Sequence, residues 1–199
     1  MKKFKLTSEF IVDISGVKLF RIKALIEFGN VKAGDLGGYI EKEENLSHMG
    51  DAWVSDDARI SGNAQVFGNA QVFGDAWVFG NARVFGNAWV SGNARVFGDA
   101  QVSGNARVSG NARVSGDAQV FGDARVSGDK DYAYAHGFGS CNRTTTFFRL
   151  KDGDVGVRCG CFYGTLAQFR DKVCETHGET KKAQEYLMLA DLMEIRFKN

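Results

Sequence analysis

Proline is absent from all 199 residues, and no segment approaches the ~20 consecutive apolar residues that cross a bilayer. Uninterrupted backbone ladders are compatible with a chain that lacks proline. The basic start, residues 1–6, is not followed by the apolar run of a signal peptide. A formal net charge of +1 gives no overall attraction to nucleic acid or to a membrane. We therefore expect a cytoplasmic protein, in the host cell if phage-encoded, with no membrane partner and no sequence-specific nucleic-acid binding.

Cysteine and histidine are also scarce, with four and three copies respectively. All four cysteines lie between Cys141 and Cys174, whereas a disulfide framework would be spread more widely. This crowding indicates a reducing compartment.

The central stretch, residues 50–127, contains thirteen hexads of one phrase, Gly-(Asn/Asp)-Ala-X-Val-(Ser/Phe). The second hexad departs from it, with Asp56 in place of Gly and Ile60 in place of Val. Ala and Val stand two residues apart, so both side chains point to one face of a short strand and X points to the other. Gly-Asn and Gly-Asp supply residues that tolerate the positive φ of a tight corner. Three strands and three corners close a triangle, which predicts a solenoid with coils of 18 residues stacked about 4.8 Å apart.

This phrase resembles the hexapeptide repeat of left-handed parallel β-helices, in which an aliphatic residue precedes a small one by four positions, as Val66 precedes Ala70. The lead-in segments GDLGGYIE (residues 34–41) and NLSH (residues 45–48) resemble a largely uncharacterised group of such proteins carried by phages and prophages. The resemblance implies a mainly β fold, a single left-handed β-helix with caps at both ends. We expect an N-terminal β cap over residues 1–29, the β-helix over 30–135 and a C-terminal ββαα unit over 136–199.

The flanks carry their own local signals. Residues 4–13 and 18–28 read as two strands around Ser15-Gly16, and the irregular first coils are expected to bury Val31, Leu36, Ile40 and Leu46. Residues 144–150 and 154–162 read as a hairpin. Thr165 and Gly178 can begin and end a helix, and a second helix is expected over residues 180–197. Its apolar positions are Ala183, Tyr186, Leu187, Ala190, Met193 and Ile195.

The outward X positions form three rows when they are taken in steps of 18 residues. The rows are Trp53, Gln71, Trp89, Arg107 and Arg125; Arg59, Trp77, Arg95 and Arg113; and Gln65, Arg83, Gln101 and Gln119. Arginine beside tryptophan suits a phosphate joined to a base, through charge-assisted hydrogen bonds and stacking. The candidate ligand-binding residues are therefore Arg95, Arg113, Arg107, Arg125, Trp77 and Trp89. The alternative is that these side chains only keep exposed strands soluble, because repeats replicate residues without selecting each one.

The Ser/Phe position beside each corner also forms rows. Phe67 and Phe85 fall in one row and Phe79 and Phe97 in another, while Phe73 stands alone in the third. An exposed row of phenylalanines is an apolar patch that a monomer seldom leaves in contact with water. Left-handed β-helix proteins often form trimers through such surfaces, so the resemblance implies a homo-oligomer, and we expect a trimer. The alternative is that each ring folds along its own ridge.

Acyl transfer from acyl-coenzyme A, with a histidine base, is the best-known activity of the resembling family. The regular hexads contain no histidine, and only His48 and His136 flank them. A histidine base needs a pocket and an orienting partner, and the sequence indicates neither. The alternative catalytic residues are His48 and His136.

A zinc site is the second alternative chemistry. Cys159-Gly-Cys161 on a strand and Cys174-X-X-His177 on a helix could together supply three sulfurs and one nitrogen. This spacing is not one of the strong zinc-finger patterns, and cysteine is a common buried apolar residue. We therefore expect no metal and no cofactor. The preferred function is non-enzymatic binding of a host protein or a small anionic, nucleotide-like ligand, with an acyltransferase or a structural spacer or virion component as alternatives.

Overall fold

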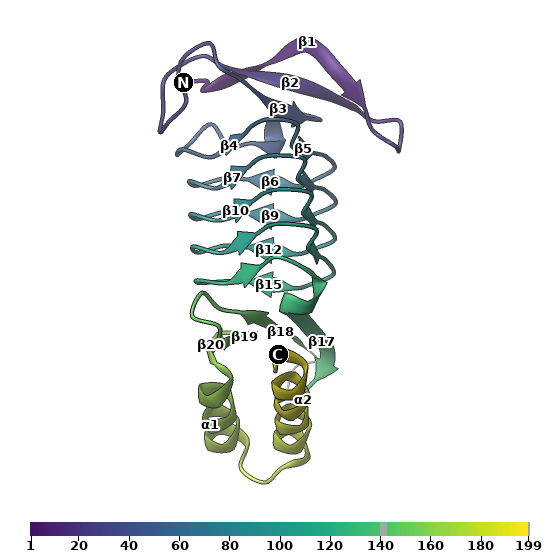
Figure 1. The fold of residues 1–199 in the computed structure, drawn as a ribbon, viewed down its shortest axis with the longest axis vertical. Coiled ribbons are helices and arrows are strands. Elements are labelled where there is room, and N and C mark those ends of the chain that lie inside the picture. Colours follow the sequence, from purple (N-terminus) through teal and green to yellow (C-terminus); the bar gives the residue numbers. More distant parts are fainter. Residues whose placement is uncertain (140–142, 199) are drawn as a thin grey trace.

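A computed structural model describes residues 1–139 and 143–198 as a column of stacked coils between an N-terminal hairpin and a C-terminal α/β unit (Figure 1). The two termini lie toward opposite ends of the column (Figure 1). Neither described helix combines the length and the hydrophobicity needed to cross a bilayer.

The N-terminal end is an antiparallel hairpin of β1 (Phe4–Val12) and β2 (Lys18–Ala24). Strand β3 (Leu36–Ile40) pairs antiparallel with β2 and parallel with a solenoid strand, so one sheet continues from the hairpin into the coils. Strand β2 ends at Ala24, earlier than predicted. The chain then turns at Gly29, whose φ is 51°, and Phe28 pairs with Val31 across this turn.

The predicted interior of the first coils is mostly correct. Ile40 and Leu46 are fully buried, and Val31 packs against the core. The prediction for Leu36 is wrong, since 52% of its surface is exposed. Leu36 opens β3 opposite Lys23 of β2, at an irregular register, and so lies outside the coil interior. A short 3-10 helix, Glu43–Asn45, follows β3.

The predicted solenoid is present, with one two-residue strand in every hexad. Its three sheets have the orders β1-β2-β3-β5-β8-β11-β14, β16-β13-β10-β7-β4 and β15-β12-β9-β6. Each strand pairs in parallel with the strand 18 residues away, as Trp89 pairs with Gln71 and Arg107. The strands are β4 (Trp53–Val54), β5 (Arg59–Ile60), β6 (Gln65–Val66), β7 (Gln71–Val72), β8 (Trp77–Val78), β9 (Arg83–Val84), β10 (Trp89–Val90), β11 (Arg95–Val96), β12 (Gln101–Val102), β13 (Arg107–Val108), β14 (Arg113–Val114), β15 (Gln119–Val120) and β16 (Arg125–Val126).

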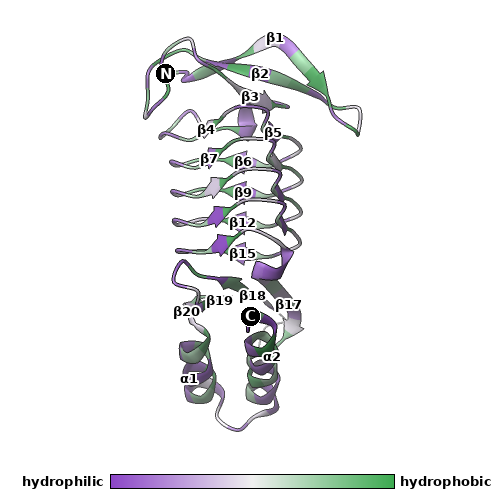
Figure 2. Cartoon of the chain, in the orientation of Figure 1, coloured by the Kyte–Doolittle hydropathy of each residue, from purple (hydrophilic) through white to green (hydrophobic). Residues whose placement is uncertain are grey.

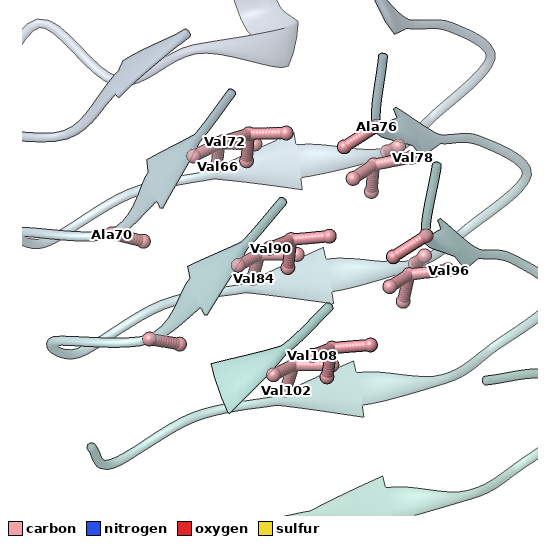
Figure 3. Close-up of a cluster of buried hydrophobic side chains, with 14 of the residues drawn as sticks. Val66, Ala70, Val72, Ala76, Val78, Val84, Val90, Val96, Val102 and Val108 are labelled. Carbon is pink, nitrogen blue, oxygen red and sulfur yellow. The ribbon is translucent and has the colours of Figure 1, made fainter. Parts of the chain in front are cut away.

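The alanines and valines of the repeat fill the interior of the column (Figure 3). From Ala70 to Ala124 each of these side chains is completely buried, which confirms the predicted alternation. The corners leave no room for larger residues. Gly86 has a φ of 69°, and a β-carbon there would lie 3.1 Å from the backbone nitrogen of Gly104 in the next coil. The sequence period therefore dictates both the core and the spacing of the coils.

Backbone hydrogen bonds give the column a direction. The N–H groups that link the coils donate to carbonyl oxygens in the following coil, as Trp89 donates to Ala106 at 2.9 Å. The first coil is consequently left with unpaired carbonyl groups and the last coil with unpaired N–H groups. A buried polar group without a partner costs about 1–3 kcal/mol, so each end needs partners of the opposite kind.

Side-chain donors satisfy the carbonyl groups at the N-terminal end. Lys3 Nζ donates to the carbonyl oxygens of Gly50 and Ala52, at 3.1 and 2.7 Å. Asn45 Nδ2 donates to those of Gly62 and Ala64, at 3.1 and 2.8 Å. Gly62 and Ala64 hold the same places in their hexad as Gly50 and Ala52 do in theirs. One lysine and one asparagine thus replace the N–H groups of a missing coil.

Side-chain acceptors satisfy N–H groups at the C-terminal end. Asp129 Oδ1 accepts from the N–H of Arg113 at 2.8 Å, and Thr146 Oγ1 accepts from that of Gln119 at 2.9 Å. Asp131 Oδ2 accepts from the N–H of Ser127 at 2.9 Å and from its hydroxyl group. Burial raises the pKa of Asp131, but its hydrogen bonds with Ser127 outweigh this and hold the pKa below its ordinary value.

The burial of Lys3 predicts a pH effect on stability. Desolvation lowers the pKa of its amine from the ordinary 10.5 to about 8, against a smaller opposing effect of Asp51. Between about pH 8 and 10.5 the unfolded chain therefore binds more protons at this site than the folded chain, and a rise in pH favours folding. The free energy of unfolding of the wild type, minus that of Lys3→Met, should rise by up to about 3 kcal/mol over this range.

Urea denaturation of the wild type and of Lys3→Met at several pH values measures this difference. The other titratable groups are the same in both proteins, so their contributions cancel. A difference that stays constant or falls as the pH rises would contradict the prediction.

The C-terminal unit contains a four-stranded antiparallel sheet and two helices. The 3-10 helix Asp129–Asp131 leads from the last coil into the sheet, whose order is β17 (Tyr132–Phe138), β18 (Arg143–Arg149), β19 (Val155–Cys159) and β20 (Phe162–Thr165). Helices α1 (Leu166–His177) and α2 (Lys181–Phe197) follow. Thr165 and Gly178 are the caps of α1, as predicted.

Two strands of this unit were not predicted. Gly160, with a φ of 57°, turns the chain between β19 and β20 and so divides the expected strand over residues 154–162. Strand β17 begins inside the stretch assigned to the β-helix. The core assignment of Ile195 is wrong, because 69% of it is exposed. Helix α2 is covered on one face only, the face that buries Ala183, Tyr186, Ala190, Met193 and Phe197.

Candidate ligand-binding surfaces

The three predicted rows of outward side chains are present on the solenoid. Residues 18 apart lie directly beside one another in the parallel ladders, as Arg95 lies beside Trp77 and Arg113. Trp53 differs from the expectation of exposure, since it is only 4% exposed. The ring of Phe28 covers its edge at a centroid distance of 5.4 Å. The lead-in segment therefore removes the first tryptophan from the surface and leaves Trp77 and Trp89.

One row forms a groove that contains three of the six candidate residues. Trp89, Arg107 and Arg125 line it together with Phe73 and a row of serines, Ser91, Ser109 and Ser127. We call this surface the Trp89 groove. Its volume is about 450 Å³, and Val126 completes the lining, in which there is no carboxylate. These serines occupy the Ser/Phe position of the repeat. A phenylalanine at the same position would fill the groove.

The side chains of the Trp89 groove already contact one another. The guanidinium carbon of Arg107 lies 4.6 Å from the ring centroid of Trp89, and Phe73 meets the indole edge-on at 5.9 Å. Arg125 Nη1 donates to the carbonyl oxygens of Asn105 and Ala124, at 3.0 and 2.9 Å. Trp89 is nevertheless 41% exposed. The cation–π contact holds Arg107 against Trp89, and the hydrogen bonds to carbonyl oxygens fix Arg125.

The neighbouring row brings its candidate residues together less closely. Arg95 lies over Trp77 at 5.9 Å from the ring centroid, and Trp77 Nε1 donates to Ser61 Oγ at 3.3 Å. Arg113 lines a different cavity of about 480 Å³, with Arg196 from α2. Arg196 was missed in the sequence because nothing in α2 indicates that it reaches the last coil.

The corner phenylalanines stack as predicted. Phe67 and Phe85 lie 4.9 Å apart with rings 1° from parallel, and Phe79 and Phe97 lie 5.0 Å apart with rings 3° from parallel. Each of these rings is half-buried, so stacking along the ridge already removes part of the apolar surface from water. Phe121 belongs to the first row and packs against Tyr163 of β20. The homotrimer stays a prediction.

The third row carries an unpredicted ladder of corner amides. Asn63 Nδ2 donates to Asn81 Oδ1 at 3.2 Å, and Asn81 Nδ2 donates to Asp99 Oδ1 at 3.1 Å. A second ladder links Asn69, Asn87, Asn105 and Asp123. Each series ends on a carboxylate, which can only accept. The signal was visible in the sequence as asparagine recurring every 18 residues, and it indicates a stabilising role for these corners.

The two candidate catalytic histidines lie at different ends of the column. His48 stacks on Phe4 at 4.3 Å, and its Nδ1 accepts from the N–H of Lys3 at 3.2 Å. Burial lowers the pKa of His48, against the opposing charge of Glu43. His136 is exposed, with Nδ1 2.9 Å from Thr144 Oγ1 and 3.7 Å from Asp117. His48 thus joins the N-terminal cap, and neither histidine lines the Trp89 groove.

The candidate zinc ligands are only partly brought together. Cys159, Cys161 and His177 line one cavity in the C-terminal unit, but Cys174 is exposed on α1 and is not part of its lining. Cys159 ends β19 and Cys161 lies beyond the turn at Gly160, so they do not share one strand face as expected. Within residues 1–139 and 143–198, no cluster of three or more His, Cys, Asp or Glu side chains could hold a metal ion. Cys141 lies outside the described residues.

The parallel ladders that an 18-residue coil builds in three sheets define the chain as a β-solenoid repeat protein. Three overlapping windows, residues 76–92, 88–104 and 100–116, match the family model described as YdcK beta solenoid repeat. No curated protein sequence matches the chain. The matched windows include Trp89 and Arg107, two residues of the Trp89 groove.

Proposed function

We propose that this β-solenoid is a non-enzymatic binding protein that holds a small planar anion, such as a nucleotide, in the Trp89 groove. The observation that carries the proposal is the stack of Arg107 on the exposed ring of Trp89, one coil above Arg125. Two guanidinium groups and an aromatic ring thus lie within one groove of about 450 Å³.

The groove offers each part of a nucleotide a matching partner. The Arg107 guanidinium, held over the indole, is a planar group on which a base can stack. Arg125 uses Nη1 for the carbonyl groups, and the described residues provide no partner for its Nη2, which is therefore available to a phosphate. The hydroxyl groups of Ser109 and Ser127 can donate further hydrogen bonds.

Rigidity supports binding at this surface. Trp89, Arg107 and Arg125 come from β10, β13 and β16, whose backbones are fixed by the ladder and by the buried valines beneath. A site on such strands loses little conformational entropy when a ligand binds. The proposal requires no acid–base group.

The test is a titration of the protein with a panel of nucleoside monophosphates, nucleoside diphosphates and cyclic dinucleotides. Calorimetry and tryptophan emission measure the binding. Wild type should bind at least one member. Arg125→Ala should weaken its binding about tenfold or more, since charge-assisted hydrogen bonds contribute about 1.5–3 kcal/mol. Arg107→Ala should weaken it by a similar factor, since it removes the planar group on which the base stacks. Trp89→Ala should weaken it by about 1–3 kcal/mol through the loss of stacking.

Arg83→Ala is the matched control, because Arg83 occupies the same X position on the third sheet. Its binding should equal that of the wild type. Equal loss in Arg83→Ala and Arg107→Ala would show that only net charge matters and would refute the groove. If Arg95→Ala with Arg113→Ala abolished binding instead, the ligand would belong to the neighbouring row.

We further propose a phage or prophage setting, in which sequestration of a host nucleotide signal or a host protein would serve as counter-defence. The support is the resemblance carried by residues 34–41 and 45–48, together with the binding chemistry of the groove. Mass spectrometry of purified virions separates this role from a structural one, since a counter-defence factor is not needed in the particle.

A further inference from the structure

A second cavity lies in the C-terminal unit, away from the solenoid faces. It is bounded by Arg143 of β18, Phe162 of β20, Phe169, Lys172 and His177 of α1, and Tyr186 of α2. We call it the C-terminal pocket. Its volume is about 470 Å³, within the range of small-molecule sites. In Figure 1 the helices α1 and α2 extend from the sheet that contains β18 to β20.

Aromatic rings form the wall of the C-terminal pocket. Phe169 lies 5.6 Å from both Phe162 and Tyr186, and His177 stacks on Tyr186 at 5.8 Å. Both helices carry hydrophobic and hydrophilic residues (Figure 2), and the buried residues of α1 are Leu166, Phe169 and Val173. This wall can cover both faces of an aromatic ligand.

Arg143 and Lys172 are the exposed basic residues of the lining, and no carboxylate of the described residues lines the cavity. Arg143 is exposed and has no ion-pair partner among the described residues. Lys172 pairs with Glu175 in the solvent at 2.8 Å, an exposed contact that a ligand can displace at little cost. The nearby carboxylate of Glu185 is occupied by the N–H of Gly139 at 3.2 Å. The pocket is therefore apolar within and positive at its rim.

Cys159 and Tyr186 of the lining, together with the buried Thr145 behind Cys159, carry neutral polar groups. Thr145 Oγ1 donates to Cys159 Sγ at 3.2 Å, and Cys159 Sγ lies 3.8 Å from Tyr186 Oη. Neutral groups within and cations at the rim favour a ligand that inserts an uncharged ring and leaves its anionic group at the opening. A cationic or doubly charged ligand without a ring has no matching surface here.

We propose that the C-terminal pocket binds a small organic anion with a fused or linked aromatic ring system, independently of the Trp89 groove. Arg143 and Lys172 hold its anionic group, and the rings of Phe162, Phe169 and Tyr186 hold its apolar part. This makes the C-terminal unit a second binding module as well as a cap for the last coil.

The probe is 8-anilinonaphthalene-1-sulfonate, and N-phenyl-1-naphthylamine provides the same rings without the charge. Dye emission and calorimetry on the full chain should show that the sulfonate binds about tenfold more tightly than the neutral amine. Arg143→Gln should weaken sulfonate binding about tenfold without changing binding of the neutral amine. Thr176→Trp, a substitution at an exposed position on the pocket lining, should fill the cavity and weaken both dyes at least tenfold.

Lys151→Ala is the control, because Lys151 is exposed in the β18–β19 turn and is not part of the pocket. Its affinity for the dye should be unchanged. Competition by 1-naphthoate and by 1-naphthyl phosphate then identifies the preferred anionic group. Less than a twofold effect of both Arg143→Gln and Thr176→Trp overturns the proposal, as does equal affinity for the two dyes.

The two sites can be tested separately. All three tryptophans lie in the solenoid and none lines the C-terminal pocket, so tryptophan emission reports on the solenoid, and dye emission reports on the site that holds the dye. The double variant Arg107→Ala/Arg125→Ala should leave dye binding unchanged. If it abolished dye binding, the dye would occupy the groove and the C-terminal pocket would be refuted. Loss of nucleotide binding alone would leave the C-terminal pocket supported.

Discussion

Asn45→Asp is expected to lower the free energy of unfolding by about 4 kcal/mol. Asn45 is buried, and its amide nitrogen satisfies two carbonyl groups of the first coils, at 3.1 and 2.8 Å. A carboxylate of the same shape removes both donors and places a negative charge against two carbonyl oxygens. Asn45→Ala removes the donors without adding the charge, so its cost should be smaller, about 2–3 kcal/mol.

The effect of Asn45→Asp should depend on pH. Burial beside carbonyl oxygens raises the pKa of the new carboxyl group above its unfolded value of about 3.9. The unfolded chain then loses this proton first as the pH rises, so the variant is destabilised progressively from about pH 4 upward and recovers in acid. Chemical denaturation at pH 4 and pH 7, referred to the wild type at each pH, measures this recovery.

Asn93→Asp provides the control for Asn45→Asp. Asn93 is an exposed corner residue, and Asp75 occupies the same corner one coil earlier. This variant should stay within about 0.5 kcal/mol of the wild type. A comparable loss in Asn45→Asp and Asn93→Asp would mean that the first coil does not depend on a side-chain donor.

Val90→Asp is expected to cost at least about 4 kcal/mol, because it buries an unpaired carboxylate in the middle of the column. Val90 is completely buried and lies between Val72 and Val108 in its ladder. Since each coil contacts only its neighbours, the damage should separate the coils before and after it. Thermal unfolding followed by circular dichroism should show two transitions where the wild type shows one.

Val12→Asp is the matched control for Val90→Asp. Val12 lies at the end of β1 and is 56% exposed. It should change the free energy of unfolding by less than about 1 kcal/mol. A small effect at both valines would contradict the close-packed interior shown in Figure 3.

The lateral faces of the solenoid could be predicted residue by residue. The strand period of two fixed which side chains are inside, and the 18-residue coil fixed that Trp89, Arg107 and Arg125 share one row. Both follow from spacing along the chain alone. Trp53 is the exception, because its cover comes from Phe28, which lies outside the repeat.

The ends could not be predicted in the same way. Lys3 and Asn45 look like ordinary surface residues in the sequence, yet they replace the N–H groups of an absent coil. Their role depends on the direction of the backbone hydrogen bonds and on contacts that span 49 and 19 residues. No local pattern encodes either.

The C-terminal unit shows the same limit in a different form. Helix α1 and its caps could be predicted because capping is local. The turn at Gly160, the exposure of Ile195 and the pocket between α1, α2 and β20 could not, since each depends on which surfaces meet in space.

The sequence by itself thus determined the solenoid, its coil length, its core of alanine and valine, and the rows in which arginine and tryptophan meet. Repetition makes these features local, because every coil solves the same packing problem with the same residues. Only the tertiary structure decided how the two ends are capped, which tryptophans remain exposed and where the second cavity lies. These features arise where the repeat stops. The contacts there join residues whose separation along the chain follows no regular period.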